Sequence, residues 1–224
     1  MFTALLDGLD IQDKLITADA LLTQRKLADY LVQRGAHYHF TAKGNQATLQ
    51  QDITLSFQDR AAPDFAEITP PDHGRIETRR IWCSPALNAY LDFPHVAQVF
   101  LIEREVLHKK RGHRSLEIAV GLTSLDPTQA NAQQVLAANR GHWTIENRCH
   151  YVIDWNFDED RSRIRTGHGP DNVSRLRRFA IGVLTQYAKG KTSIAEKMAK
   201  LNRNTRLVFD YLRMTKNSTR RAAA

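Results

Sequence analysis

Hydrophobic positions near the N-terminus follow the period of a strand, then of a helix, then of a strand again. Residues 14–19 (KLITAD) are a short β-prone run that ends in an acid, and residues 20–34 repeat apolar positions at helical spacing until Gly35. Residues 37–42 (HYHFTA) are strand-like. The pattern predicts a strand–helix–strand unit with two parallel strands and a right-handed crossover. Functional sites in such sheets lie at the carboxyl ends of the strands, where Asp19 stands.

The pattern becomes β-rich after residue 60. Residues 61–74 contain a proline-rich segment that reads as a loop, and three β-rich runs follow at residues 75–84, 96–110 and 115–125. Residues 128–155 are compatible with a helix, in which Gly141 is the expected interruption.

A second helix is predicted over residues 171–190, where apolar residues form one stripe and arginines the opposite face. The last 35 residues read as two short basic helices and a frayed tail. We therefore predict an α/β fold with four parts: a strand–helix–strand core (1–60), a β-rich insertion (61–126), core helices (127–190) and a basic helical tail (191–224). Trp82 and Trp155 are expected in the core.

Composition places the chain among soluble globular proteins. Of its 224 residues, 42% are hydrophobic and 25% are charged. No apolar run approaches the roughly 18 residues of a membrane span, and the N-terminus lacks a basic leader region. Cys83 and Cys149 lie far apart without a C-x-x-C motif, which fits a reducing compartment. We expect a cytoplasmic protein that has no membrane partner.

Positive charge is concentrated in the C-terminal third. Lys and Arg number 32 against 24 acids, a net charge of +8. Residues 1–139 hold 14 basic and 16 acidic side chains, whereas residues 140–224 hold 18 and 8. This distribution suits a polyanionic partner such as nucleic acid, and it also serves solubility.

Polar residues with catalytic chemistry gather at residues 140–165. His142, Glu146 and His150 fall at i, i+4 and i+8, on one face of a helix. Three interpretations fit: a zinc site, although the H-E-x-x-H order is absent; a solvated polar face; or a pairing of Glu146 with a distant acid. Asp19 is the candidate for that distant acid, since it ends a predicted strand whereas Glu146 lies on a later predicted helix. Two hard cations at a phosphodiester site need carboxylates that converge from different elements in this way.

Six strings in one order resemble the H-repeat-associated branch of the DDE transposases of bacterial insertion sequences. They are T-A-D-A-L-x-T-Q (17–24), K-G-N-Q (43–46), H-G-R-I-E-T-R (73–79), H-W-x-I-E-N-x-x-H (142–150), F-x-E-D-x-S-R-I-R (157–165) and P-x-N-V-S-x-L-R-R (170–178). The resemblance runs from about residue 10 to the end of the chain. It implies a partial ribonuclease-H-like fold with a β-rich insertion before the last acid.

The resemblance also implies roles for two carboxylates. Asp19 matches the second family aspartate and Glu146 the final glutamate, and both would be catalytic metal ligands for Mg²⁺ or Mn²⁺, with two ions in the intact site. The implied reaction is hydrolysis at a transposon end followed by strand transfer into target DNA. The resemblance also implies a possible homo-oligomer on DNA and association with the nucleoid when DNA is bound. Oxygens of two carboxylates serving one such centre should lie roughly 4 to 8 Å apart.

The first family aspartate, which stands in an Asp-Gly-Lys segment, has no match here. Asp7 and Gly8 follow no β-prone run and precede no Lys, so we interpret them as a loop or a helix end. We therefore expect a C-terminal piece of a transposase, with an incomplete catalytic triad. A non-catalytic DNA-binding remnant is the alternative, and a zinc hydrolase is a more distant one.

Basic residues near these motifs are the expected DNA contacts. The related clan places an Arg four residues before the glutamate and a Lys seven after it, where this chain has His142 and Ile153. Lys43, Asn45 and Gln46 fit either a DNA contact or a hairpin turn. Acids 158–160 fit either an additional carboxylate beside the metal ligands or, as we expect, ion pairs with Arg161, Arg163 and Arg165. The DNA-binding candidates are Lys43, Arg75, Arg79, Arg140, Arg148, Arg161, Arg163, Arg165, Arg175, Arg177 and Arg178.

Overall fold

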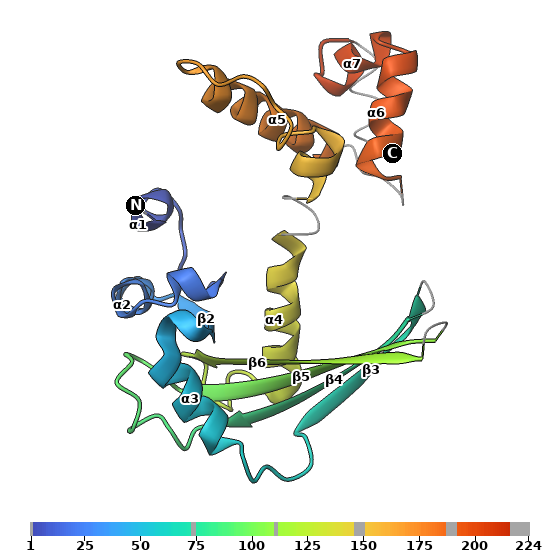
Figure 1. Cartoon of the computed structure of the whole chain (residues 1–224). Coiled ribbons are helices and arrows are strands. Elements are labelled where there is room, and N and C mark those ends of the chain that lie inside the picture. The colour runs from blue at the N-terminus through green and yellow to red at the C-terminus, as the bar shows by residue number, and fades with distance from the viewer. Residues whose placement is uncertain (1, 73–74, 110–111, 146–150, 187–191, 216–224) are drawn as a thin grey trace. The chain divides into compact units, whose positions relative to one another are not determined.

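The computed structural model describes residues 2–72, 75–109, 112–145, 151–186 and 192–215 (Figure 1). The chain divides into two compact units, Met1–His142 and Trp143–Ala224, and each is described by itself. A six-stranded sheet with helices forms the first unit, and helices dominate the described part of the second. The predicted α/β class is confirmed at this level. In the described ranges, no helix is long and apolar enough to cross a membrane.

The strand–helix–strand unit forms as predicted. After the short helix α1 (Phe2–Leu6), strands β1 (Leu15–Ala18) and β2 (His37–Ala42) run parallel and are joined through helix α2 (Arg25–Gln33). The helix does not begin at residue 20, because Ala20–Leu22 form a 3₁₀ turn. Buried Thr23 follows this turn and donates its hydroxyl to the Thr41 carbonyl at 2.7 Å. This bond ties the loop after β1 to the end of β2.

The β-rich region forms an antiparallel meander that extends the same sheet. Its strands are β3 (Phe65–Asp72), β4 (Arg75–Ser84), β5 (Gln98–His108) and β6 (His113–Thr123). Strand β6 also pairs antiparallel with β2, so the strand order is β1-β2-β6-β5-β4-β3.

The predicted proline-rich loop at residues 61–74 is wrong, because much of it is strand β3. A proline has no N–H for a strand ladder, and sheets tolerate it at edges and irregularities. Strand β3 is an edge strand, and its register with β4 shifts between Thr69 and Asp72. Pro70 and Pro71 lie within that irregular stretch.

Helices cover both faces of the sheet (Figure 1). Helices α2 and α3 (Ala47–Ser56) pack with Trp82 and Leu101 on one face, and the predicted burial of Trp82 is confirmed. On the other face, helix α4 (Ala132–Ile145) packs with Ile81 and Ile102. Neighbouring strand residues point to opposite faces, which separates these two clusters.

Helix α4 continues through Gly141, so the predicted interruption is wrong. A glycine inside a helix costs only about 1 kcal/mol relative to alanine. Val135 and Leu136 are almost completely buried against the sheet, and burial of such side chains contributes about 1.5 to 3 kcal/mol each. Packing therefore outweighs the local preference of Gly141.

His39 of β2 connects the sheet to α4. Its buried ring stacks on Phe100, with centroids 4.5 Å apart and planes 6° from parallel, and its Nε2 lies 3.5 Å from Oδ1 of Asn139 in α4. Gly121 makes this stacking possible, because a Cβ there would lie 2.4 Å from the Phe100 ring and 2.2 Å from the Phe40 carbonyl oxygen. Burial lowers the pKa of His39 to about 4, so the imidazole is neutral at physiological pH.

The described part of the second unit contains a π-helical turn and three helices. These are Val152–Asn156, α5 (Gly169–Gln186), α6 (Ile194–Arg203) and α7 (Arg206–Tyr211). The predicted helix over residues 171–190 is confirmed as far as residue 186. Two short helices also form in the last 35 residues as predicted, but only α6 is basic, because α7 holds one arginine and one aspartate. Buried Lys197 of α6 donates to the Leu184 carbonyl at the end of α5, at 2.9 Å.

Trp155 is not a core residue, contrary to prediction. It is 71% exposed on the π-helical turn, where it stacks with Tyr151 at a centroid distance of 6.2 Å. Leu176 and Phe179 of the predicted apolar stripe are also more than 60% exposed, whereas Leu184 is buried. Helical periodicity identified the helix but did not determine which of its residues are covered.

Gly121 and Gly141 allow a matched test of the fold. Alanine at position 121 meets backbone and ring atoms that cannot move independently, and we expect it to lower the free energy of unfolding by about 2 to 3 kcal/mol. Alanine at position 141 meets nothing within 4 Å and should raise that energy by about 0.5 to 1 kcal/mol. Urea denaturation followed by circular dichroism measures both. Equal effects of the two substitutions would contradict the close approach at Gly121.

The neutral, buried state of His39 predicts an acid-sensitive fold. Because its pKa is lower in the folded chain than the usual 6.5, its contribution is fully present above pH 6.5 and is lost as the pH falls toward 4. The lost stability amounts to about 3 kcal/mol. Denaturation midpoints between these pH values should fall more steeply for the native chain than for His39→Gln. The exposed His113→Gln serves as the control and should behave like the native chain.

Candidate active site

Asp19 stands directly after β1 and begins the 3₁₀ turn Ala20–Leu22. Its Oδ1 accepts the backbone N–H of Ala20 at 2.6 Å, and its side chain is 53% exposed. This backbone hydrogen bond, together with nearby Lys43, holds the pKa of Asp19 below its usual value. The carboxylate is therefore ionised, oriented and accessible at the carboxyl end of a parallel strand.

Lys43 stands at the equivalent end of β2 and faces Asp19. Its Nζ lies 3.3 Å from Oδ1 of Asp19, and its side chain is 64% exposed. The two side chains form an ion pair between the ends of adjacent strands. Such an exposed pair contributes little to stability, so its main effect is on the charge around Asp19.

The K-G-N-Q string does not form a hairpin turn. Gly44–Gln46 make a 3₁₀ turn that leads into α3. Asn45 Nδ2 donates to the Ala20 carbonyl at 2.8 Å, and Gln46 Nε2 donates to the Thr23 carbonyl. Asn45 and Gln46 therefore fix the loop that carries Asp19, a positioning role that their sequence alone did not indicate.

Helix α4 approaches the same strand pair through His142. The Nδ1 of His142 lies 3.1 Å from Oγ1 of Thr17 in β1, two residues before Asp19. Together with the contact between Asn139 and His39, this places the end of α4 beside both parallel strands. Spacing did not reveal the contact between His142 and Thr17, which are 125 residues apart.

Glu146, Arg148 and His150 lie outside the described residues. The expected separation between the oxygens of Asp19 and Glu146 therefore stays a prediction, and so does the zinc interpretation. Among the described residues, no three His, Cys, Asp or Glu side chains form a group that would hold a metal ion.

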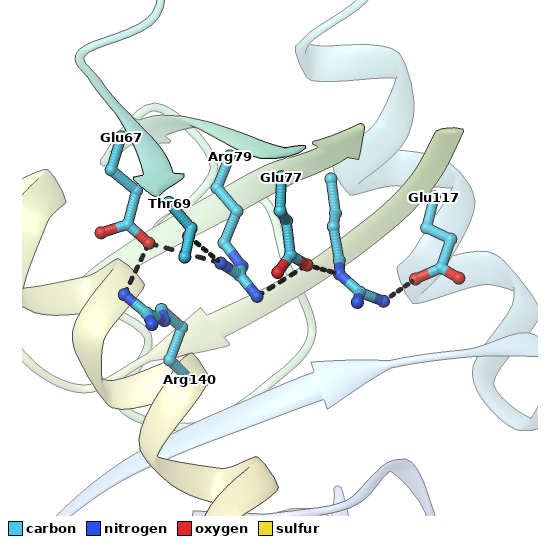
Figure 2. A network of polar contacts seen from close by, with 7 residues as sticks. Glu67, Thr69, Glu77, Arg79, Glu117 and Arg140 are labelled. Carbon is cyan, nitrogen blue, oxygen red and sulfur yellow. Dashed lines mark hydrogen bonds and ion pairs between the residues drawn. The ribbon is translucent and has the colours of Figure 1, made fainter. Parts of the chain in front are cut away.

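Arg79 and Arg140 belong to an ion-pair network on the α4 side of the meander (Figure 2). Glu67 of β3 pairs with both arginines, at 3.7 Å and 2.8 Å respectively. Arg79 also pairs with Glu77 at 2.8 Å, and its side chain is only 15% exposed. Both of these DNA-binding candidates are therefore paired with carboxylates of the protein itself. Arg75, at the start of β4, is exposed.

The arginines of the second unit differ in how they are engaged. Arg161 pairs with Asp158 as expected, at 3.5 Å, whereas Glu159 pairs with Arg177 of α5 at 3.5 Å. Arg177 is 15% exposed. Arg175 pairs with Asp171 one helical turn away, at 2.8 Å, and stays 73% exposed. Of the remaining candidates, the exposed ones are Arg163, Arg165 and Arg178.

Comparison with known proteins identifies the family. The family described as "Transposase DDE domain" matches residues 1–172, which include Asp19, Lys43 and α4. The chain is 28% identical over 206 residues to "H repeat-associated putative transposase YhhI" of Escherichia coli K12, covering 88% of this chain and 54% of that protein. It is likewise 28% identical over 221 residues to "Putative transposase YncI" of Escherichia coli O157:H7, covering 93% and 55%.

The chain thus spans about half the length of the curated relatives it matches. The family match covers the whole sheet unit, and the name of the first of these relatives agrees with the family that the six sequence strings resemble. This chain belongs to the DDE transposase family.

Proposed function

We propose that this chain contributes Asp19 and Glu146 to a two-metal site that cleaves and joins DNA during transposition of an insertion sequence. The single observation that carries the proposal is the placement of Asp19. An ionised, half-exposed carboxylate ends a parallel strand, and the helix that precedes Glu146 in the sequence contacts that same strand. Two-metal sites need carboxylates that approach from separate elements in this way.

The chemistry of Asp19 suits a hard divalent cation. Both of its side-chain hydrogen bonds with described residues use Oδ1, and carboxylate oxygens are the donors that Mg²⁺ prefers. Asp19 and Glu146 would hold the ions, which would be Mg²⁺ or Mn²⁺. When bound, two such ions polarise the phosphate and make water a stronger nucleophile.

Residues of this chain would orient the carboxylate and the DNA. The Ala20 N–H fixes the direction of Asp19, and Asn45 holds the Ala20 carbonyl in place. Lys43 balances the charge of Asp19 and, with its amine exposed, would contact a phosphate that enters the site. The contact between His142 and Thr17 would set the position of α4 beside β1.

The first carboxylate of the site would come from a segment that pairs with β1. Among the described residues, β1 has a strand partner on one edge only, and the curated relatives are about twice as long as the matched region. Asp7 does not fit this role, because it directly follows α1 and accepts the Tyr30 hydroxyl at 2.6 Å. The proposed site is therefore incomplete in residues 1–224.

DNA would be the substrate, at both the transposon end and the target. Residues 140–224 carry 18 basic and 8 acidic side chains, so phosphate contacts in this region would be favourable. Arg175 and Arg178 of α5 are exposed candidates for such contacts. Assembly as a homo-oligomer on DNA belongs to the same proposal.

A non-catalytic DNA-binding remnant is the second candidate function. The charge distribution favours it, because the excess of basic residues in the C-terminal third needs no catalytic site to bind DNA. Metal dependence separates the two candidates. DNA binding that is unchanged by a chelator, without cleavage under any of the conditions below, would support the remnant.

The catalytic proposal predicts that cleavage depends on adding the missing carboxylate. We expect residues 1–224 alone to leave transposon-end DNA uncut in Mg²⁺, because one metal lacks a principal ligand. Fusion to the N-terminal segment of a relative should restore cleavage. In that fusion, Asp19→Asn or Glu146→Gln should then reduce the rate by several orders of magnitude, as measured by gel analysis of labelled ends.

The exposed Asp59→Asn is the matched control for this experiment, because it removes the same charge within the sheet unit. It should leave the cleavage rate unchanged. Cleavage that survives both active-site substitutions would mean that the carboxylates are misassigned. Cleavage by residues 1–224 alone would mean that another acid completes the site.

The C-terminal arginines predict a salt-dependent affinity for DNA. Each neutralised phosphate changes the slope of log K against log salt by about 0.9. Arg175→Gln combined with Arg178→Gln should flatten that slope by up to about 1.8. Arg177 is left intact because its partly buried pair with Glu159 joins two segments of the unit. An unchanged slope in fluorescence anisotropy titrations would show that these side chains are only solvated.

A further inference from the structure

The ion pair between Lys43 and Asp19 engages an oxygen that a metal ion would use. Oδ1 of Asp19 accepts the Ala20 N–H at 2.6 Å and lies 3.3 Å from the Lys43 ammonium. Both contacts are made by Oδ1, and among the described residues Oδ2 has no hydrogen-bond partner. Lys43 is therefore a monovalent cation on the carboxylate to which the proposed function assigns a divalent one.

The two partners of this ion pair are held to different degrees. The Ala20 N–H sets the direction of the Asp19 carboxylate, and Asn45 holds the Ala20 carbonyl at 2.8 Å. The backbone of Lys43 is also held, because its carbonyl accepts the Gln46 N–H at 2.8 Å. The Lys43 side chain, however, is 64% exposed, and lysine carries its charge on a flexible stem. The ammonium can therefore leave Oδ1 while the carboxylate keeps its direction.

Lys43 is the main positive charge beside Asp19. The Ala20 N–H is the largest cause of the lowered pKa of Asp19, and among charged groups Lys43 has a larger effect than His142. Exposed ion pairs of this kind are weak, so partners of higher charge can replace them. A divalent ion is such a partner for Asp19, and a DNA phosphate is such a partner for Lys43.

We propose that Lys43 competes with the metal ion for Asp19 and releases the carboxylate when a DNA phosphate binds the ammonium. Without DNA, the ammonium would weaken metal binding by charge repulsion and by its contact with Oδ1. A phosphate that enters the site would draw the ammonium away and add its own negative charge, and both changes favour the metal.

Binding of metal and of DNA would thereby be coupled, because each would raise the affinity for the other by the same factor. This coupling would keep the metal affinity low until the substrate is present. The inference rests on the proposed function, because it assumes that Asp19 binds a metal ion and that DNA reaches the site.

Mn²⁺ binding to the 224-residue chain tests the competition. Bound Mn²⁺ broadens the NMR signals of nearby amides, and the Ala20 amide is hydrogen-bonded to the Asp19 carboxylate. An ion about 2 Å from Oδ1 would lie about 5 Å from the ammonium, and repulsion over that distance, reduced by salt, corresponds to about fivefold in affinity. Lys43→Gln should therefore strengthen Mn²⁺ binding about fivefold. Lys43→Arg keeps the charge and should stay near the native affinity.

Lys14→Gln is the matched control for charge removal. Lys14 is exposed directly before β1, at the other end of that strand from Asp19. A strand of four residues separates the two positions by more than the Debye length of about 8 Å at physiological salt. The control should leave the Mn²⁺ affinity unchanged. Asp19→Asn should abolish the broadening of the Ala20 signal, which identifies Asp19 as the ligand.

A short DNA duplex tests the release of Lys43. The duplex should raise the Mn²⁺ affinity of the native chain more than that of Lys43→Gln, by up to about fivefold, because only the native chain has an ammonium to remove. Electron paramagnetic resonance measures the free Mn²⁺ in each sample, since DNA also binds cations.

The outcomes separate this inference from the proposed function. Mn²⁺ binding that Asp19→Asn abolishes, with equal affinities for the native chain and Lys43→Gln, would overturn the competition and leave the proposed function standing. An equal gain from the duplex in both chains, or no gain in either, would overturn the release of Lys43. If Mn²⁺ broadens the Ala20 signal in neither chain, Asp19 is not a metal ligand, and the proposed function is wrong together with this inference.

Discussion

The connection between the ends of β1 and β2 is the constraint on which the candidate site depends. Parallel pairing brings Asp19 and Lys43 to the same edge of the sheet. Hydrogen bonds from Thr23, Asn45 and Gln46 then join the two loops that follow these strands. Each bond joins one of these side-chain donors to a backbone carbonyl, so the two loops are held together by these three side chains. The Asp19 carboxylate thus has a fixed position at the edge of the sheet.

Ion pairs between side chains on neighbouring strands stabilise the meander. Arg79 and Arg104 are directly opposite each other on neighbouring strands, an arrangement that is unfavourable for like charges. Glu77 pairs with both arginines and so offsets their repulsion. Glu67 extends this network to Arg140 of α4. The same acids that stabilise the sheet thereby neutralise its central arginines.

The positions of most strands and helices could be predicted from hydrophobic periodicity, and Asp19 from one motif. Contacts between residues far apart in the sequence could not be predicted in this way. Alternating apolar positions identified β1, β2 and the later strands, and the family motif singled out Asp19. Strand β3 was missed because edge position, which makes its prolines harmless, is a property of the assembled sheet. The exposure of Trp155 and the pairing of Arg79 likewise depend on neighbours that local patterns cannot specify. Sequence therefore predicted the elements better than their partners.

The position of α4 links the buried core to the candidate chemistry. His39 is neutral and stacked in the core, and it contacts Asn139 one turn before His142 meets Thr17. The clan that this chain resembles has an arginine at the position of His142, so that guanidinium is absent here. Lys43 supplies a full positive charge from β2 instead, 3.3 Å from Asp19. In this chain, the residue that follows β2 therefore provides the cation beside Asp19, while α4 contacts both parallel strands through Asn139 and His142.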